Sequence, residues 1–159
     1  MEILIALHVL AAILFLGPIT VAVSSFQTKA VRAAEGESTA YGAAETLASI
    51  TKNYGLLSLI VPVIGLTIFL TDMATYGKMG QFHASILLSV IAWALLFFLI
   101  IPKQQKALDA LRAQATDAPA STKAVDTADF DWAKTKSQLS MFGGIFSLLW
   151  VIIAVLMFI

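Results

Sequence analysis

Four long apolar runs without a charged side chain constrain this chain more than any other feature. They cover residues 3–23, 54–70, 82–101 and 141–159, and none of them contains Asp, Glu, Lys or Arg. Each is close to the ~20 residues that a helix needs to cross the hydrocarbon core of a bilayer. Because buried helices of water-soluble proteins rarely run this long without a charge, the runs predict an all-α fold, a membrane four-helix bundle.

The composition agrees with this prediction and removes several classes of function. The chain is 59% apolar and 13% charged, whereas soluble domains are about 45–50% apolar and about 25% charged. Its net charge is zero, so no basic surplus points to nucleic acid. It has no cysteine, which excludes disulfides, thiolate metal sites and cysteine-anchored haem. We expect residues 1–159 to form a single membrane domain.

The basic residues predict how the bundle lies in the membrane. With four spans, the connectors 24–53 and 102–140 share one side, and the chain ends share the other side with the loop 71–81. Cytoplasmic loops of membrane proteins carry an excess of Lys and Arg. The pattern therefore predicts a multi-pass membrane protein with both termini outside and the two connectors in the cytoplasm. The outer side holds only Lys78, and the inner side holds Lys29, Arg32, Lys52, Lys103, Lys106, Arg112, Lys123, Lys134 and Lys136.

The two connectors contain helical patterns of their own. Residues 24–35 continue the first helix, and Gly36 is expected to break it, with Ser38 capping the next helix. Asp129 and Asp131 stand where a helix start favours acidic groups, and residues 116–128 read as a linker. The chain is thus expected to form two helical hairpins that extend into the cytoplasm. Apolar residues at helical spacing mark these extensions: Ala43, Leu47, Ile50 and Tyr54, then Ala107, Leu108, Leu111 and Ala115.

Small residues at helical spacing mark the faces by which the helices pack. Within lipid, helices associate through close contact, which small side chains allow. These faces predict packing inside the bundle, and they would equally suit docking against another membrane protein. Pro18 and Pro62 are expected to kink their helices. The interaction residues are Gly55, Ser58, Pro62 and Gly65 on the second span, and Gly143 with Ser147 and Ser140 with Gly144 on the fourth.

His8 and His83 are the two histidines, and both are expected near the outer side, close to Glu2 and Asp72. Two histidines on neighbouring helices could bind a haem through both axial positions, or a metal ion with the help of a carboxylate. The alternative is a structural role for neutral imidazoles near the membrane interface. We expect no cofactor, and keep a haem- or metal-binding protein that uses His8 and His83 as an alternative.

The remaining sequence shows few reactive groups. It contains no glycine-rich phosphate loop, no plausible Ser/His/Asp set and no acidic residue deep in a span. Pumps, ion-coupled transporters and ATPases normally show such a feature. The absences argue against an autonomous enzyme. A passive transporter for a small solute remains a further alternative, with a path that Ser58, Thr67, Ser85, Ser89 and Ser147 could line.

Residues 7–17, LHVLAAILFLG, carry a resemblance. They look like the opening of small bacterial membrane proteins of four spans and unknown function, although Leu16-Gly17-Pro18 departs from the Trp-Gly or Val-Gly pair of many members. The Ala/Thr/Asp-rich linker 116–128 also resembles actinobacterial sequences, where small four-helix proteins accompany the supercomplex of cytochrome bcc and cytochrome oxidase. The resemblance implies a non-catalytic accessory or assembly subunit of a respiratory complex, with integral membrane subunits and lipids as partners, and it transfers no catalytic residue.

Overall fold

The computed structural model describes residues 2–115 and 130–158, and every regular element in this part of the chain is a helix. Four helical stretches are long and apolar enough to cross a membrane: Glu2–Ala34, Ser38–Thr71, Gly80–Ala115 and Trp132–Leu156. The predicted all-α fold is therefore confirmed, with four helices that could cross a membrane by their length and composition. In chain order the elements are α1 (Glu2–Ala34), α2 (Ser38–Leu57), α3 (Ile60–Thr71), α4 (Met73–Tyr76), α5 (Gly80–Ala94), the π-helical segment η1 (Leu95–Ile100), α6 (Ile101–Ala115) and α7 (Trp132–Leu156).

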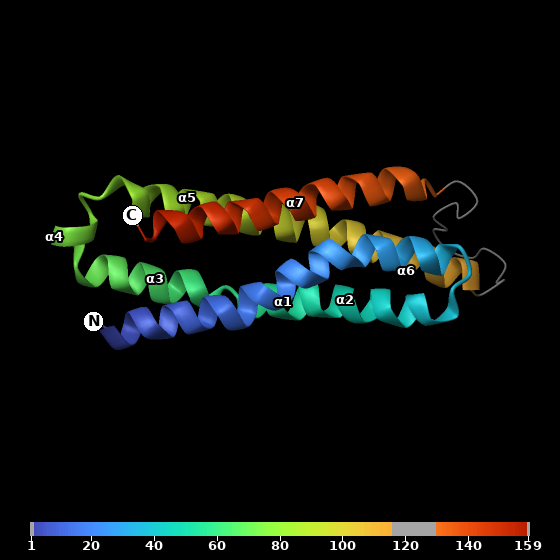
Figure 1. Ribbon diagram of the computed structural model, residues 1–159, viewed down its shortest axis with the longest axis horizontal. Helices are drawn as coiled ribbons and strands as arrows, with labels where there is room; N and C mark the ends of the chain where they lie inside the picture. Colours follow the sequence, from blue (N-terminus) through green and yellow to red (C-terminus); the bar gives the residue numbers. More distant parts are fainter. Residues whose placement is uncertain (1, 116–129, 159) are drawn as a thin grey trace.

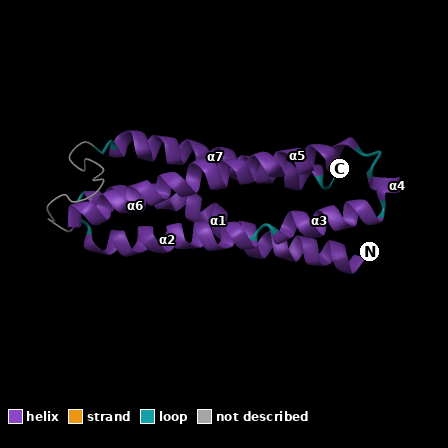
Figure 2. Ribbon diagram, turned by 180° about the vertical axis from the view of Figure 1, so that it is seen from behind, coloured by secondary structure: helices purple, strands orange, loops and turns teal. Residues whose placement is uncertain are grey.

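The helices lie side by side in an elongated bundle (Figures 1 and 2). Both chain ends and the short helix α4 lie at one end, which we call the terminal end. The turn 35–37, the last turn of α6 and the first turn of α7 lie at the other, the connector end. In the terminal half, α1 runs with α3 along one side and α5 runs with α7 along the other.

The turn between α1 and α2 confirms one prediction and contradicts another: Gly36 ends α1, but Ser38 does not cap α2. Gly36 has φ +97°, the left-handed conformation that glycine adopts without a Cβ penalty. The N–H of Gly36 donates to the Ala33 carbonyl and that of Glu37 to the Arg32 carbonyl, which closes α1 in a Schellman motif. This closure uses the chain as far as Glu37, so Glu37 is the N-cap and Ser38 is already helical. The prediction that Ser38 caps the helix is wrong.

The second span is interrupted one turn before its proline. Helix α2 ends at Leu57 and α3 begins at Ile60. Pro62 has no N–H and its ring clashes with a carbonyl four residues back, which is that of Ser58. The Ser58 carbonyl instead accepts from Val61, three residues on, at 3.0 Å. Helix α1, in contrast, continues through Pro18, and its ribbon changes direction near the middle (Figure 1).

The third span widens before its own proline. The π-helical segment η1 leads directly into α6, where Pro102 is the second residue. A π-helical turn accommodates the ring and the missing donor of a proline within a continuous helix. Leu96 and Ile100 of this segment are buried in the core, so the widened turn lies inside the bundle.

The main core runs from the middle of the bundle to the connector end. It includes Phe26 and Ala30 of α1, Ala44 of α2, Leu108 of α6 and Phe146 of α7. Leu47 and Tyr54 pack against this core, as their helical spacing predicts. Asp131 caps α7, its carboxylate accepting from the N–H of Lys134 at 2.8 Å. The linker 116–128, with Lys123, and Asp129 lie outside the described residues.

Candidate functional site

A hydroxyl group is buried at the break in the second span. Ser58 has no exposed surface, and its Oγ donates to the Gly55 carbonyl at 2.7 Å. The same oxygen accepts a hydrogen bond of 3.0 Å from the indole Nε1 of Trp93 on α5. In a membrane, polar groups of the spans must find partners within the protein. Ser58 therefore joins the second span to the third at the point where the second helix is interrupted.

Trp93 also begins an aromatic cluster between α5 and α7. Its ring meets Trp150 edge to face, with the centroids 4.8 Å apart and the planes at 79°, and Trp150 contacts Phe146 at 6.1 Å. The indole Nε1 of Trp150 is buried and has no hydrogen-bond partner within the described part of the chain. The two tryptophans thus share a contact but differ in whether the N–H group is satisfied.

The predicted small residues divide into those that pack inside the bundle and those that face outward. A Cβ added at Gly143 would lie 2.9 Å from the backbone oxygen of Val23 on α1. Ser147, four residues on, donates from Oγ to the Gly143 carbonyl at 2.9 Å. Gly144 and Ser140 are exposed, and a Cβ at Gly144 would meet nothing within 4 Å. One small-residue pair of α7 is therefore used in internal packing, and the other is left open.

Close approach on the second span depends on two further glycines. A Cβ at Gly55 would lie 3.1 Å from Cδ2 of Leu96 in η1. A Cβ at Gly65 would lie 2.8 Å from Cε1 of His8. Gly55 therefore brings α2 against the third span, and Gly65 brings α3 against the first turns of α1. Pro62, half-buried, lies between them in sequence and marks the helix break.

The structure places both histidines against one face of α3. The half-buried His8 imidazole lies against Gly65, and its buried Nδ1 has no hydrogen-bond partner in the described part of the chain. The His83 ring meets Phe69 edge to face, with the centroids 5.4 Å apart. Its Nδ1 lies 3.3 Å from the Met79 carbonyl; because a carbonyl only accepts, Nδ1 is the donor in this hydrogen bond. Gly65 and Phe69 are one helical turn apart.

This placement brings the two histidines to the same helix, but it does not join them to a set of carboxylates. Among residues 2–115 and 130–158, no group of three or more His, Asp and Glu side chains could hold a metal ion. A haem or metal site at His8 and His83 stays a prediction. What the spans provide chemically is a set of helix contacts. These involve the buried hydroxyl groups of Ser58 and Ser85, an aromatic cluster and closely packed glycines.

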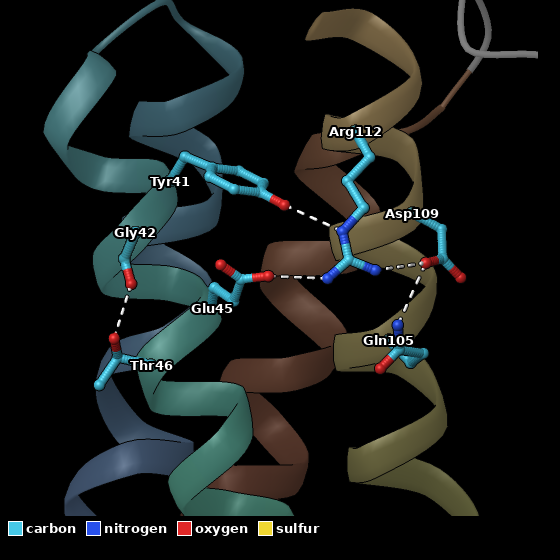
Figure 3. A network of polar contacts seen from close by, with 7 residues as sticks. All are labelled: Tyr41, Gly42, Glu45, Thr46, Gln105, Asp109 and Arg112. Atoms are coloured by element: carbon cyan, nitrogen blue, oxygen red, sulfur yellow. Dashed lines mark hydrogen bonds and ion pairs between the residues drawn. The ribbon is translucent and has the colours of Figure 1, made fainter. Parts of the chain in front are cut away.

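The connector end carries a polar network between α2 and α6 (Figure 3). Arg112 donates from Nη2 to the Glu45 carboxylate at 2.8 Å and from Nε to the Tyr41 hydroxyl at 2.9 Å. Its Nη1 lies 3.5 Å from Asp109, which also accepts from Gln105. The bonds to Glu45 and Tyr41 raise the pKa of Arg112 above its usual value. Its charge is therefore constant over the physiological pH range.

A groove of about 430 Å³ runs between α2 and α6, beside this network. Its polar lining residues are Glu45, Ser49, Lys52, Asn53, Gln104, Gln105 and Arg112. Gln104 is only 2% exposed, and neither its amide nitrogen nor its amide oxygen has a hydrogen-bond partner within the described chain. Buried polar groups are normally satisfied, so an unpartnered amide calls for a reason.

The sequence analysis did not select Gln104, although a signal was present. Gln104 precedes Ala107, Leu108 and Leu111 at spacings of three, four and seven residues, so it continues their buried stripe. A glutamine within an apolar stripe marks a buried amide. Gln27 of α1 is the other buried glutamine, 6% exposed, and its Nε2 donates to the Ser24 carbonyl at 2.8 Å.

Comparisons of the chain with protein-family models, with curated proteins and with solved structures gave no match.

Proposed function

We propose that this protein is a non-catalytic accessory or assembly subunit of a larger membrane complex. The observation that carries the proposal is the outward face of α7. Ser140 and Gly144 have small-xxx-small spacing, are exposed, and lie next to the exposed apolar side chains of Met141, Ile145 and Leu148. Small residues allow a second helix to approach closely within lipid. The Gly143/Ser147 pair, three positions along, already serves the bundle's own packing, so the outer pair is left for another protein.

Respiratory subunits of the cytochrome bcc and cytochrome oxidase type are the partners that we propose. This choice rests on the resemblance of residues 7–17 and 116–128. The burial of the spans agrees with a docked subunit, since only 17–28% of the residues in the apolar windows are buried within this chain. The remaining span surface is available to lipid and to neighbouring subunits.

Replacement of Gly144 by leucine tests the docking face. The leucine points into open space in the isolated protein, so the bundle should fold normally. A clash at a tight helix interface costs about 1–3 kcal/mol, which corresponds to roughly fivefold to a hundredfold in affinity. Affinity purification from native membranes in mild detergent should recover respiratory subunits with the wild type and about tenfold less of them with Gly144→Leu.

Leu87→Ala on α5 is the control, because Leu87 is also exposed, at 61%, and lies on another helix. Its yield of partners should match that of the wild type. If the wild type purifies alone, or if Gly144→Leu retains every partner, the proposed role is wrong.

The proposed orientation places the connector end in the cytoplasm and both termini outside. Of the nine basic residues in the described part of the chain, only Lys78 lies near the terminal end. The other eight lie in the connector half, which is the distribution that the positive-inside bias produces. They are Lys29, Arg32, Lys52, Lys103, Lys106, Arg112, Lys134 and Lys136.

Single cysteines test this orientation without background, because the chain has none of its own. In intact cells, a membrane-impermeant maleimide should label Lys78→Cys fully and Lys136→Cys only after the membrane is permeabilised. Both side chains are exposed and lie outside the uncharged apolar runs, so neither change should disturb folding. Labelling of Lys136→Cys in intact cells would show that the connector end faces outward, opposite to the proposed orientation.

A further inference from the structure

We propose that the groove between α2 and α6 is a binding site for the phosphate-bearing headgroup of an anionic phospholipid. The inference rests on the proposed orientation in a membrane, and it does not depend on the accessory role. It starts from the buried, unpartnered amide of Gln104, which lines the groove. A carboxamide can donate two hydrogen bonds, and phosphate oxygens accept them.

The groove also holds a cation without a partner. Lys52 lines it next to Asn53, and within the described chain Lys52 forms no ion pair or side-chain hydrogen bond. Glu45, the one acidic residue of the lining, is bonded to Arg112 at 2.8 Å. The negative charge in the groove is thus already balanced, and the ammonium group of Lys52 is available for an anion.

The depth of the groove matches that of a lipid headgroup. Lys52 and Asn53 come immediately before the apolar run 54–70, and Gln104 and Gln105 lie within about one helical turn after the run 82–101. Arg112 and Glu45 lie two turns farther from the membrane, so the unpaired cation is at the membrane side of the groove. Basic pockets between membrane helices on the cytoplasmic side are suited to anionic headgroups.

An apolar surface continues from the groove into the membrane. Leu56 and Ile60 follow Lys52 along the same face of the second span and are 65% and 47% exposed. Phe98, one turn before Ile101 of the groove lining, is 78% exposed. The polar groove would hold the phosphate group of a phospholipid, and the apolar surface beside it would hold the acyl chains. A free phosphate would use only the groove.

Lipid binding to the purified full-length protein tests the site. Native mass spectrometry in mild detergent, with phosphatidylglycerol titrated against phosphatidylcholine, should show preferential retention of phosphatidylglycerol. A basic residue near an anionic surface contributes about 1 kcal/mol, so Lys52→Gln should weaken retention about fivefold. Gln104→Leu, which keeps the volume and removes the amide, should weaken it as well.

Two variants serve as matched controls. Lys136→Gln removes an exposed lysine of α7 that does not line the groove. Gln27→Leu removes the other buried amide, which also lies outside the groove. Both should bind phosphatidylglycerol within about twofold of the wild type, because they change neither the groove lining nor its charge. If Lys52→Gln and Lys136→Gln lose phosphatidylglycerol to the same extent, the retention depends on general surface charge and the proposal is wrong.

Competition with soluble glycerol phosphate distinguishes a lipid headgroup from a free phosphate compound as the ligand of the groove. It should compete poorly with phosphatidylglycerol, because it cannot use the apolar surface beside the groove. If glycerol phosphate displaces the lipid fully at equal concentration, the site binds free phosphate compounds and the lipid assignment is wrong. If Lys52→Gln retains phosphatidylglycerol but loses a co-purifying protein, the groove holds a protein segment instead.

Discussion

Replacing Gly143 by alanine will destabilise the bundle by about 1–3 kcal/mol, the usual range for overpacking a tight contact. The added methyl group would lie 2.9 Å from the carbonyl oxygen of Val23. That oxygen belongs to the backbone of α1 and cannot rotate away as a side chain could. Either α7 moves outward or α1 bends, and both changes loosen the packing between the first and fourth spans. Unfolding of the detergent-solubilised protein, followed by circular dichroism, measures the loss.

Gly144→Ala provides the control for this prediction. It adds the same methyl group to the same helix, one residue away, where nothing lies within 4 Å. The intrinsic helix propensity gained from Gly→Ala is thus equal in the two variants and cancels in their difference. We expect Gly144→Ala to lie within about 0.5 kcal/mol of the wild type or slightly above it. Equal stabilities of the two alanine variants would contradict the close approach of α7 to Val23.

The largest single loss should come from Trp93→Ala, about 3–5 kcal/mol, because it removes a buried indole. Trp93 is 7% exposed, packs against Trp150, and donates the hydrogen bond to Ser58. Trp93→Phe keeps an aromatic ring but loses the donor, so it should cost less. Ser58→Ala leaves the indole N–H unsatisfied. A double-mutant cycle between these two changes should give a coupling energy of about 0.6–1.7 kcal/mol, the range of hydrogen bonds between membrane helices.

Trp150→Phe separates the hydrogen bond from the aromatic contact. The two rings touch each other, but the Trp150 N–H has no partner in the described structure. Its removal therefore leaves no group unsatisfied, and Trp150→Phe should be milder than Trp93→Phe in the same unfolding assay. If the order is reversed, the bond between Trp93 and Ser58 does not hold the second and third spans together.

Much of the fold could be predicted from local sequence. The four uncharged runs predict the spans, because hydrocarbon accepts only helices whose backbone bonds are satisfied internally. Gly36 ends α1 and Asp131 caps α7, since both act within a few residues of chain. The prediction that Ser38 caps α2 was wrong for a reason that is also local. The Schellman motif that closes α1 extends to Glu37, so Glu37 is the N-cap, one residue before Ser38.

The candidate sites were less accessible to sequence reasoning, because they depend on contacts between distant segments. Trp93 and Ser58 are 35 residues apart, and nothing local pairs a serine with an indole. Arg112 and Glu45 are 67 residues apart. The sequence did place His8 and His83 on the same side, and the structure sets both against α3, at Gly65 and Phe69.

Hydropathy, helix signals and the basic residues of this chain are local properties. By themselves they predicted four helices apolar enough to cross a membrane, the helix ends at Gly36 and Asp131, and the expected orientation. The rotation of each helix about its axis is not local, because an apolar helix in lipid has no polar side to set which face turns inward. The tertiary structure alone decided that Gly143 meets Val23 while Gly144 faces outward. It also decided that Gln104 lies in the groove between α2 and α6, since only the packing of the two helices encloses that amide.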